Sequence, residues 1–414
     1  MLAGGSVMTV HDSAPEVRRY WSWRSIRPVE EKPLPELIDH LHQLWRQAVR
    51  RRLTGAARPG QTLSGGLDSR AILAEAAPQA PRWTAITYGV PGCDDARWAQ
   101  RAAETAGATW VFHPLYSGRN PDWLERRTAA IQSTDGLIDL VDLMHLEALP
   151  LQAALFDVHL SGYIGDAVVG PTFTHVATPE DVLISMPWYE MRLGMAWNDA
   201  RALMDEAVAH LDGAAARFAL FEHKLPQSTN RWSNAWRPRL RVRKPFVDYA
   251  FFDFCQGLPV RVRGELRLYE RWLRARYAAC FTSIPNQRTG VPILAPRWRV
   301  QLARGTRVVW RHVQPLLAAA GVPVRPQLRA YQNDELFWRT PESRARIEGT
   351  ILRPGSLCGE IFGRDRVKAV VADWFERAAA PTQVIGALYV YESYHRDLAA
   401  SLHAARGAQE GIPS

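Results

Sequence analysis

Apolar side chains recur at steps of three and four residues between positions 34 and 53, with Leu41 and Trp45 among them. This spacing predicts an amphipathic helix. The last turn of the helix carries three arginines at 50–52, and basic side chains complement the negative end of a helix. Residues 1 to about 31 show no such period, and we expect this start of the chain to be irregular.

From about residue 56, short apolar segments alternate with segments of helical period. Strands are expected in the segment ending at residue 63 and at 82–88, 110–113 and 158–160, with helices at 71–77, 94–106, about 121–132 and 139–154. A repeated order of strand and helix predicts a parallel sheet with helices on both faces. Ligands of such sheets bind beyond the carboxyl ends of the strands.

Strand patterns fade after about residue 178. Helices are expected at 199–221, 265–279, 300–320, 342–351 and 366–404. The predicted organisation is a linker and helix at 1–55, an α/β core at 56–178, a mainly helical part at 179–406 and a tail at 407–414. The predicted fold class is therefore α/β, doubly wound around a parallel sheet, with a helical C-terminal half.

The composition is that of an ordinary globular protein, since 47% of the 414 residues are hydrophobic and 22% are charged. The four cysteines are widely spaced and lack histidines at metal-binding spacing, which argues against a disulfide framework and a zinc site. No run of about 18 apolar residues and no secretory signal pattern occurs. We therefore expect a cytoplasmic protein without membrane association.

Basic residues outnumber acidic ones, with 51 Lys and Arg against 42 Asp and Glu. Such a surplus favours acidic partners, nucleic acid among them. The arginines are scattered, however, and are not gathered into one block with interleaved aromatic residues. A solvated surface and ligands for nucleotide phosphates explain them as well, so nucleic acid is not the favoured partner.

The segment 64–70, Ser-Gly-Gly-Leu-Asp-Ser-Arg, joins a predicted strand to a predicted helix. Glycines at such a turn let backbone N–H groups approach an anion, and the helix N-terminus adds partial positive charge. Ser64 and Ser69 supply hydroxyl groups, so this segment is typical of a phosphate-binding loop. Asp68 would face the phosphates, which requires a metal ion between them. No lysine follows at the spacing of a Walker A loop.

Two loops together indicate a family. The run at 64–69 resembles the pyrophosphate loop of enzymes that split ATP into AMP and pyrophosphate, in particular that of the synthetase domain of the asparagine synthetase family. The loop 161–166, Ser-Gly-Tyr-Ile-Gly-Asp, resembles the loop of that family whose final aspartate shares a magnesium ion with the first. The resemblance implies a pyrophosphate-loop ATPase core and Mg²⁺ on Asp68 and Asp166. A plain turn aspartate is the alternative for Asp166.

Further matches extend the resemblance over most of the chain. Residues 87–95 are similar to the segment that lies against adenine and ribose, and 243–248 are similar to Arg-x-Pro-Phe-Leu-Asp, although Arg241 replaces a glutamate. Residues 269–274 match Lys-x-x-Leu-Arg without its lysine. The residues that the resemblance assigns to ATP and pyrophosphate are Leu63, Ser64, Gly65, Gly66, Asp68, Ser69, Tyr88, Gly89 and Gly162.

The resemblance implies catalytic roles for Tyr163 and Arg288. Arg288 falls where the family has a lysine that stabilises the adenylate and the tetrahedral intermediate; arginine keeps the charge but donates a proton poorly. A surface arginine is the alternative. Tyr163 matches a tyrosine that acts with a glutamate in β-lactam-forming relatives. Thr229 falls at the position of that glutamate, and a buried structural tyrosine explains Tyr163 at least as well.

The activity implied by the resemblance is ATP-dependent amide formation, in which a carboxylate is adenylated and then transferred to an amine. ATP and Mg²⁺ are the expected cofactors, and a small-molecule or peptide carboxylate is the expected substrate. The family's glutaminase domain is expected to be missing. The amine would then come from ammonia, from a separate amine-donor or precursor-processing protein, or from the substrate itself, as in lasso-peptide cyclases and β-lactam synthetases. A non-catalytic ATP-binding protein and a tRNA-modifying pyrophosphate-loop enzyme are the alternatives.

Overall fold

The computed structural model describes most of residues 4–410. Outside the description lie residues 116–122, 183–200, 320–337 and 378–381, much of 203–238, and single residues at 13, 81, 179 and 339.

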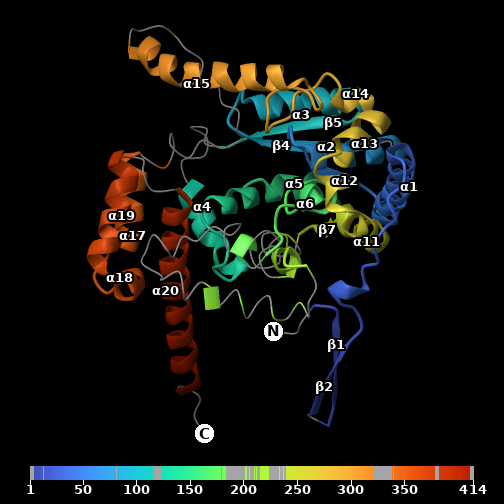
Figure 1. The fold of residues 1–414 in the computed structure, drawn as a ribbon. Helices are drawn as coiled ribbons and strands as arrows, with labels where there is room; N and C mark the ends of the chain where they lie inside the picture. Colours follow the sequence, from blue (N-terminus) through green and yellow to red (C-terminus); the bar gives the residue numbers. More distant parts are fainter. Residues whose placement is uncertain are drawn as a thin grey trace.

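A five-stranded parallel sheet lies in the middle of the α/β part (Figure 1). The strands follow one another in space as β5-β4-β3-β6-β7. Their bounds are β3 (Pro59–Thr62), β4 (Thr84–Gly89), β5 (Thr109–Pro114), β6 (Val158–Leu160) and β7 (Arg241–Arg243), and every pairing is parallel. The chain builds outward from β3 in one direction and then returns to its other side with β6. Such a switch point is where open α/β sheets bind ligands.

Helices cover both faces of this sheet. Neighbouring residues of a strand point to opposite faces, and Ala85 belongs to one buried core while Ile86 belongs to another. The first core contains α1 (Leu34–Leu53), α2 (Leu67–Ala76), α3 (Asp94–Thr105), α11 (Tyr249–Gly257) and α13 (Leu268–Arg276), and the second contains α5 (Leu149–Leu155). The predicted doubly wound α/β fold is confirmed.

Most predicted elements of the α/β part lie where the pattern placed them. The helix at 34–53 and the strand at 158–160 have the predicted bounds, and α4 (Trp123–Ala130) lies within 121–132. The predicted helix at 139–154 is instead a 3-10 turn, η4 (Asp142–Leu146), followed by α5. Pro150 explains the division, because proline lacks an N–H and is tolerated only in the first turn of a helix.

Two expectations about strands were wrong. The start of the chain is not irregular, because β1 (Ser6–His11) pairs with β2 (Ala14–Arg19) in an antiparallel hairpin that extends away from the sheet (Figure 1). Nearly all its side chains are exposed, so no buried face imposes a period of two on the sequence. The other miss is β7, which completes the sheet inside the predicted helical part. Its three residues, Arg-Val-Arg, are too few and too basic to indicate a strand.

Helices dominate the C-terminal half, as predicted. The remaining ones there are α12 (Val260–Arg263), α14 (Ala278–Phe281), α15 (Arg297–Ala319), α17 (Pro341–Ile351), α18 (Leu357–Phe362), α19 (Arg364–Arg377) and α20 (Thr382–Glu410). Much of the predicted helix at 199–221 lies outside the described residues. The predicted tail begins too early, because α20 continues to Glu410. Among the described helices, none combines the length and apolar character needed to cross a membrane.

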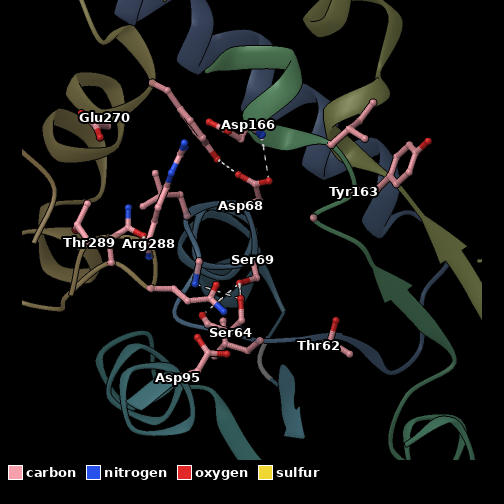
Figure 2. A pocket seen from close by; sticks show the side chains of 18 of the residues that line it. Thr62, Ser64, Asp68, Ser69, Asp95, Tyr163, Asp166, Glu270, Arg288 and Thr289 are labelled. Carbon is pink, nitrogen blue, oxygen red and sulfur yellow. Dashed lines mark hydrogen bonds between the residues drawn. The ribbon is translucent and has the colours of Figure 1, made fainter. Parts of the chain in front are cut away.

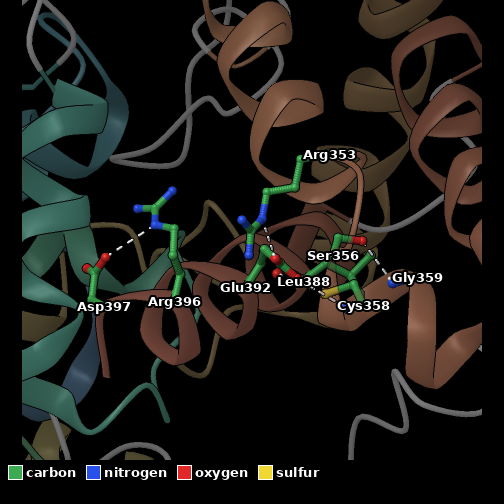
Figure 3. A network of polar contacts seen from close by, with 8 residues as sticks. All are labelled: Arg353, Ser356, Cys358, Gly359, Leu388, Glu392, Arg396 and Asp397. Carbon is green, nitrogen blue, oxygen red and sulfur yellow. Dashed lines mark hydrogen bonds and ion pairs between the residues drawn. The ribbon is translucent and has the colours of Figure 1, made fainter. Parts of the chain in front are cut away.

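Glu392 of α20 is fully buried and joins three helical segments (Figure 3). Its Oε1 accepts a hydrogen bond from Nε of Arg353 at 2.8 Å, and its Oε2 accepts one from the backbone N–H of Cys358 at 3.1 Å. Cys358 lies in the first turn of α18, where a carboxylate meets the positive end of the helix. A buried charge needs such partners, so this contact fixes α18 and the end of α17 against α20.

Candidate functional site

A cavity of about 690 Å³ opens at the carboxyl ends of β3, β4 and β6 (Figure 2). The opposite wall comes from α13, the residues preceding it and the segment 286–289. Ten of the residues predicted for the site line this cavity, namely Leu63, Ser64, Gly66, Asp68, Ser69, Tyr88, Gly162, Tyr163, Asp166 and Arg288. The fold therefore brings together residues that the sequence separates by more than two hundred positions.

The first predicted loop closes on itself through its two serines. The backbone N–H of Ser64 donates to Oγ of Ser69 at 3.2 Å, and the two hydroxyl oxygens lie 3.1 Å apart. The N–H of Gly66 donates to Oγ of Ser64 at 3.1 Å. These bonds hold both hydroxyl groups beside the N-terminus of α2, which is the positive end of a ten-residue helix. This arrangement suits an anion.

Gly65 does not line the cavity, and close packing explains why a glycine is needed at this position. Its N–H donates to Oδ1 of Asp95 at 2.6 Å, and a Cβ on Gly65 would lie 2.7 Å from the ring of Trp98. No side chain fits there. Asp95 is 1% exposed, and burial raises its pKa to about 7, although the N–H of Gly65 opposes that rise. Asp95 thus anchors the loop to α3.

Asp68 and Asp166 lie side by side at the centre of the site (Figure 2). Asp68 accepts hydrogen bonds from the backbone N–H of Asp166 at 3.1 Å and from the hydroxyl of Tyr269 at 2.7 Å. Asp166 accepts one from Thr172. Burial, and then the charge of Asp166, raises the pKa of Asp68 to about 7. Gly165 permits this approach, since a Cβ there would lie 2.6 Å from Cγ of Asp68.

This pair of carboxyl groups fits a magnesium ion. Hard oxygen ligands are those that Mg²⁺ prefers, and a divalent cation would offset both the burial and the repulsion from Asp166 that raise the pKa of Asp68. Among the described residues, no group of three or more His, Cys, Asp and Glu side chains is arranged to hold a metal. Asp68 and Asp166 would therefore hold Mg²⁺ together with phosphate oxygens and water, as the two-carboxylate pattern predicts.

Arg288 reaches the site on a short loop that is tied to the pyrophosphate loop. The backbone N–H of Gln287 donates to the carbonyl oxygen of Gly65 at 3.1 Å, and the N–H of Arg288 donates to Oδ1 of Asn286 at 2.9 Å. Burial raises the pKa of Asp166, and the charge of Arg288 opposes this rise. The guanidinium is thus close enough to act on the carboxyl group of Asp166.

Arg70, which was not predicted as a site residue, connects the loop 64–69 to the segment that precedes the loop 286–291. Its side chain is fully buried; Nε donates to the carbonyl oxygen of Gly66 at 3.0 Å, and Nη1 donates to those of Cys280 at 3.0 Å and Ile284 at 3.3 Å. Sequence reasoning also missed Tyr269 and Thr172. Arg70 and Tyr269 act through contacts some 200 residues away in the chain, which no local spacing indicates.

Tyr163 lies across the cavity from Glu270, and its hydroxyl group points away from Asp68 (Figure 2). Nζ of Lys244 lies 4.4 Å from the centre of the tyrosine ring, a cation–π contact. Burial raises the pKa of the phenol, which favours the neutral form. Thr229 lies outside the described residues. A catalytic role for Tyr163 stays a prediction.

Three other matched residues lie outside the cavity wall. Gly89 pairs within the sheet, where its carbonyl oxygen accepts the N–H of Leu115 at 2.8 Å. Arg241 pairs with Asp157 at 3.1 Å. The aspartate of the Pro-Phe-Val-Asp match, Asp248, is buried and bound by Arg51 and Arg52. Arg51 and Arg52, at the end of α1, are therefore structural partners of a buried carboxylate.

Comparison with known families agrees with this geometry. The sequence model described as asparagine synthase matches residues 40–278, which is more than half of the chain and includes both loops. The chain belongs to the asparagine synthase family. An asparagine synthase domain is an ATP-dependent ligase that forms amide bonds, and its members use ATP, typically with Mg²⁺. Arg288 lies beyond the matched residues, so its role stays a prediction. No curated protein matches the chain significantly.

Proposed function

We propose that this asparagine synthase family member activates a carboxylate as an acyl-adenylate, releases pyrophosphate and passes the acyl group to an amine. The observation that carries the proposal is the contact between Asp68 and Asp166 beside the closed loop 64–69. Carboxylates for a metal, hydroxyl groups and a helix N-terminus meet at one place, which suits the triphosphate of ATP.

Each wall of the cavity has a part in the proposed reaction. The loop 64–69 would receive the β- and γ-phosphates, and Asp68 and Asp166 would hold a magnesium ion, which supplies polarisation of the phosphates when bound. Tyr88, near the end of β4, lines the cavity, and in this proposal it contacts adenine and ribose, as the resemblance of its segment implies. Arg288 faces the α-phosphate and the acyl group. Adenylation of this kind depends on positioning and charge neutralisation.

A specialised biosynthetic amidation or cyclisation, of the kind that lasso-peptide cyclases perform, fits better than asparagine production. The support lies on the acceptor wall, where the family's lysines are replaced: Arg288 stands for one of them, and the Lys-x-x-Leu-Arg match has Glu270 at its first position. An altered acceptor wall beside an unaltered pyrophosphate loop indicates the same activation chemistry with a different substrate.

The deciding experiment is magnesium-dependent release of pyrophosphate from ATP, with purified wild-type protein beside Asp68→Asn. The panel of carboxylates includes small acids and peptides with aspartate or glutamate side chains, each with and without ammonium. We expect one class of carboxylate to trigger release and Asp68→Asn to lower its rate by about 10³-fold or more. Asp397→Asn, which changes a surface carboxylate of α20 that pairs with Arg396 outside the cavity wall, is the control.

The outcomes separate the candidate functions. Equal release by wild type and Asp68→Asn would remove Asp68 from the mechanism. Thermal stabilisation by ATP and Mg²⁺ with no release for any carboxylate would favour a non-catalytic nucleotide-binding protein. Strongly salt-dependent binding of RNA would favour the tRNA-modifying alternative.

A further inference from the structure

Among the described residues, four carboxyl groups line the main cavity. Three of them already have a role in the site described above. Asp68 and Asp166 form the metal-binding pair, and Asp95 anchors Gly65. The fourth, Glu270, lies in the first turn of α13 and forms an ion pair with Arg267. Its side chain is 23% exposed, so a molecule in the cavity can reach it.

Glu270 stands where the main cavity meets a smaller chamber of about 290 Å³. The two spaces share Arg267, Glu270, Asn286, Thr289 and Arg304. Beyond this junction the smaller chamber is lined by the apolar run 292–295, by Val300, and by the polar side chains of Arg297 and Gln301. A second substrate can therefore approach the acyl group through a chamber that is separate from the pyrophosphate loop, and it passes Glu270 on the way.

Charged groups surround Glu270 from several elements, and Arg304 of α15 lines both cavities together with it. Arg267 pairs with it from the start of the same helix, Arg288 faces it from the loop 286–291, and Asp166 faces it from α6 (Gly165–Val169). Figure 2 shows Glu270 and Arg288 on the same side of the metal-binding pair, opposite Tyr163. Burial raises the pKa of Glu270 and the charge of Asp166 adds to this rise, whereas Arg267 and Arg288 oppose it. A carboxylate in such surroundings accepts a proton more readily than one in water.

We propose that Glu270 is the general base that deprotonates the incoming amine. This role rests on the proposed adenylation. Arg267 orients the carboxylate and cannot itself accept a proton. The tyrosine predicted from the sequence is less suited, because its hydroxyl group points away from the metal-binding pair (Figure 2).

The amine arrives as an ammonium ion, and Glu270 accepts one N–H proton, which frees the nitrogen lone pair. The lone pair forms a C–N bond with the acyl carbon of the adenylate, while the electrons of the C=O bond move to oxygen. When the carbonyl re-forms, the C–O bond to AMP breaks and its electron pair leaves with the phosphate oxygen. The amide nitrogen loses its surplus proton to solvent.

The test separates the two half-reactions in wild type, Glu270→Gln, Glu270→Asp and the control Glu265→Gln, which changes an exposed carboxylate nearby. The carboxylate is the one that supports pyrophosphate release. ATP–pyrophosphate exchange measures adenylation, and hydroxylamine measures capture of the adenylate by a nucleophile that is neutral at pH 7.5. Ammonium chloride and glycinamide measure transfer to amines that arrive protonated.

For Glu270→Gln we expect exchange and hydroxylamine capture within about threefold of wild type, and transfer to the protonated amines lowered by about 100-fold or more. The residual rate should rise about tenfold per pH unit, because it follows the free amine, and Glu270→Asp should recover part of the loss. Equal rates of transfer to the protonated amines in wild type and Glu270→Gln overturn the proposal. The proposal is also overturned if Glu270→Gln loses ATP–pyrophosphate exchange as strongly as it loses transfer. Wild-type protein without any exchange rejects the proposed adenylation, and this role with it.

Discussion

The two sides of the cavity are built differently. The nucleotide side, residues 62–69, 87–95 and 161–166, consists of close backbone contacts around buried carboxyl groups, with glycines at 65 and 165 where no Cβ fits. The acceptor side, residues 263–304, presents long charged side chains, among them the exposed Arg267, Arg288 and Arg304. In the proposed reaction, close backbone packing therefore fixes the position of the groups that bind ATP. The side chains of the acceptor side can be replaced without a change of backbone, and they select the carboxylate that is adenylated.

The two sides are nevertheless joined. Arg70 donates hydrogen bonds to Gly66 on the nucleotide side and to the carbonyls of Cys280 and Ile284 that lead to the acceptor side. Gln287 donates to Gly65 from the acceptor side. A substitution on one side can therefore disturb the other side through these hydrogen bonds. Each substitution that tests one side needs a control variant that keeps the bonds of Arg70 and Gln287.

The largest expected effect concerns Asp95, the buried carboxyl group of the nucleotide side. Its pKa is 3.8 when unperturbed and about 7 when folded, so the unfolded chain ionises first as pH rises. From this group the free energy of unfolding should fall by up to roughly 4 kcal/mol between pH 4 and pH 7. Asp95→Asn removes that fall. Denaturant unfolding at pH 4, 5.5 and 7 measures the difference between the two proteins.

Asp397→Asn is the control for this prediction, because Asp397 pairs with Arg396 at the surface of α20 and is not among the groups that act on Asp95. Contributions from Asp68 are common to all three proteins and cancel in the comparison. An identical pH dependence for wild type and Asp95→Asn would contradict the view that a buried, protonated carboxyl group stabilises the loop.

The second effect tests close packing on the nucleotide side directly. Gly165→Ala places a Cβ 2.6 Å from Cγ of Asp68 and 2.8 Å from the ring of Phe246, so Asp68 must move from the N–H of Asp166. We expect ATP–pyrophosphate exchange to fall by about 100-fold, or roughly 3 kcal/mol. The exchange rate and thermal unfolding are measured together, so that a loss of fold is recognised.

Gly349→Ala is the matched control for Gly165→Ala. Nothing lies within 4 Å of its added Cβ, and it lies within α17. It should leave exchange unchanged and raise stability by roughly 0.5–1 kcal/mol, since alanine favours a helix over glycine. Normal exchange in Gly165→Ala would mean that the position of Asp68 does not matter for activation.

How far the sequence predicts the site differs between the same two sides. On the nucleotide side, the loop 64–69 and Asp166 carry their chemistry in consecutive residues, so their place at strand ends followed from alternation of strand and helix. The acceptor side depends on Tyr269 and Arg70, whose roles arise from contacts between distant segments. The hairpin and β7 were missed for a related reason, since neither buries a long alternating face.

The smallest effect concerns Arg288, the exposed cation of the acceptor side. Its charge acts on Asp166 and would act on a bound α-phosphate. Water screens an exposed charge, so Arg288→Met should lower ATP–pyrophosphate exchange only about tenfold, or roughly 1.4 kcal/mol. Arg288→Lys should stay within about threefold of wild type, because the charge matters here more than the planar group.

The control is Arg271→Met, which removes an exposed arginine of α13 outside the cavity wall. If Arg288→Met and Arg271→Met both match wild type, Arg288 is a surface arginine. If Arg288→Met lowers the rate of ATP–pyrophosphate exchange and Arg288→Lys restores it, the acceptor side tolerates a conservative substitution of its side chain. The nucleotide side, where Gly165→Ala is expected to be costly, does not.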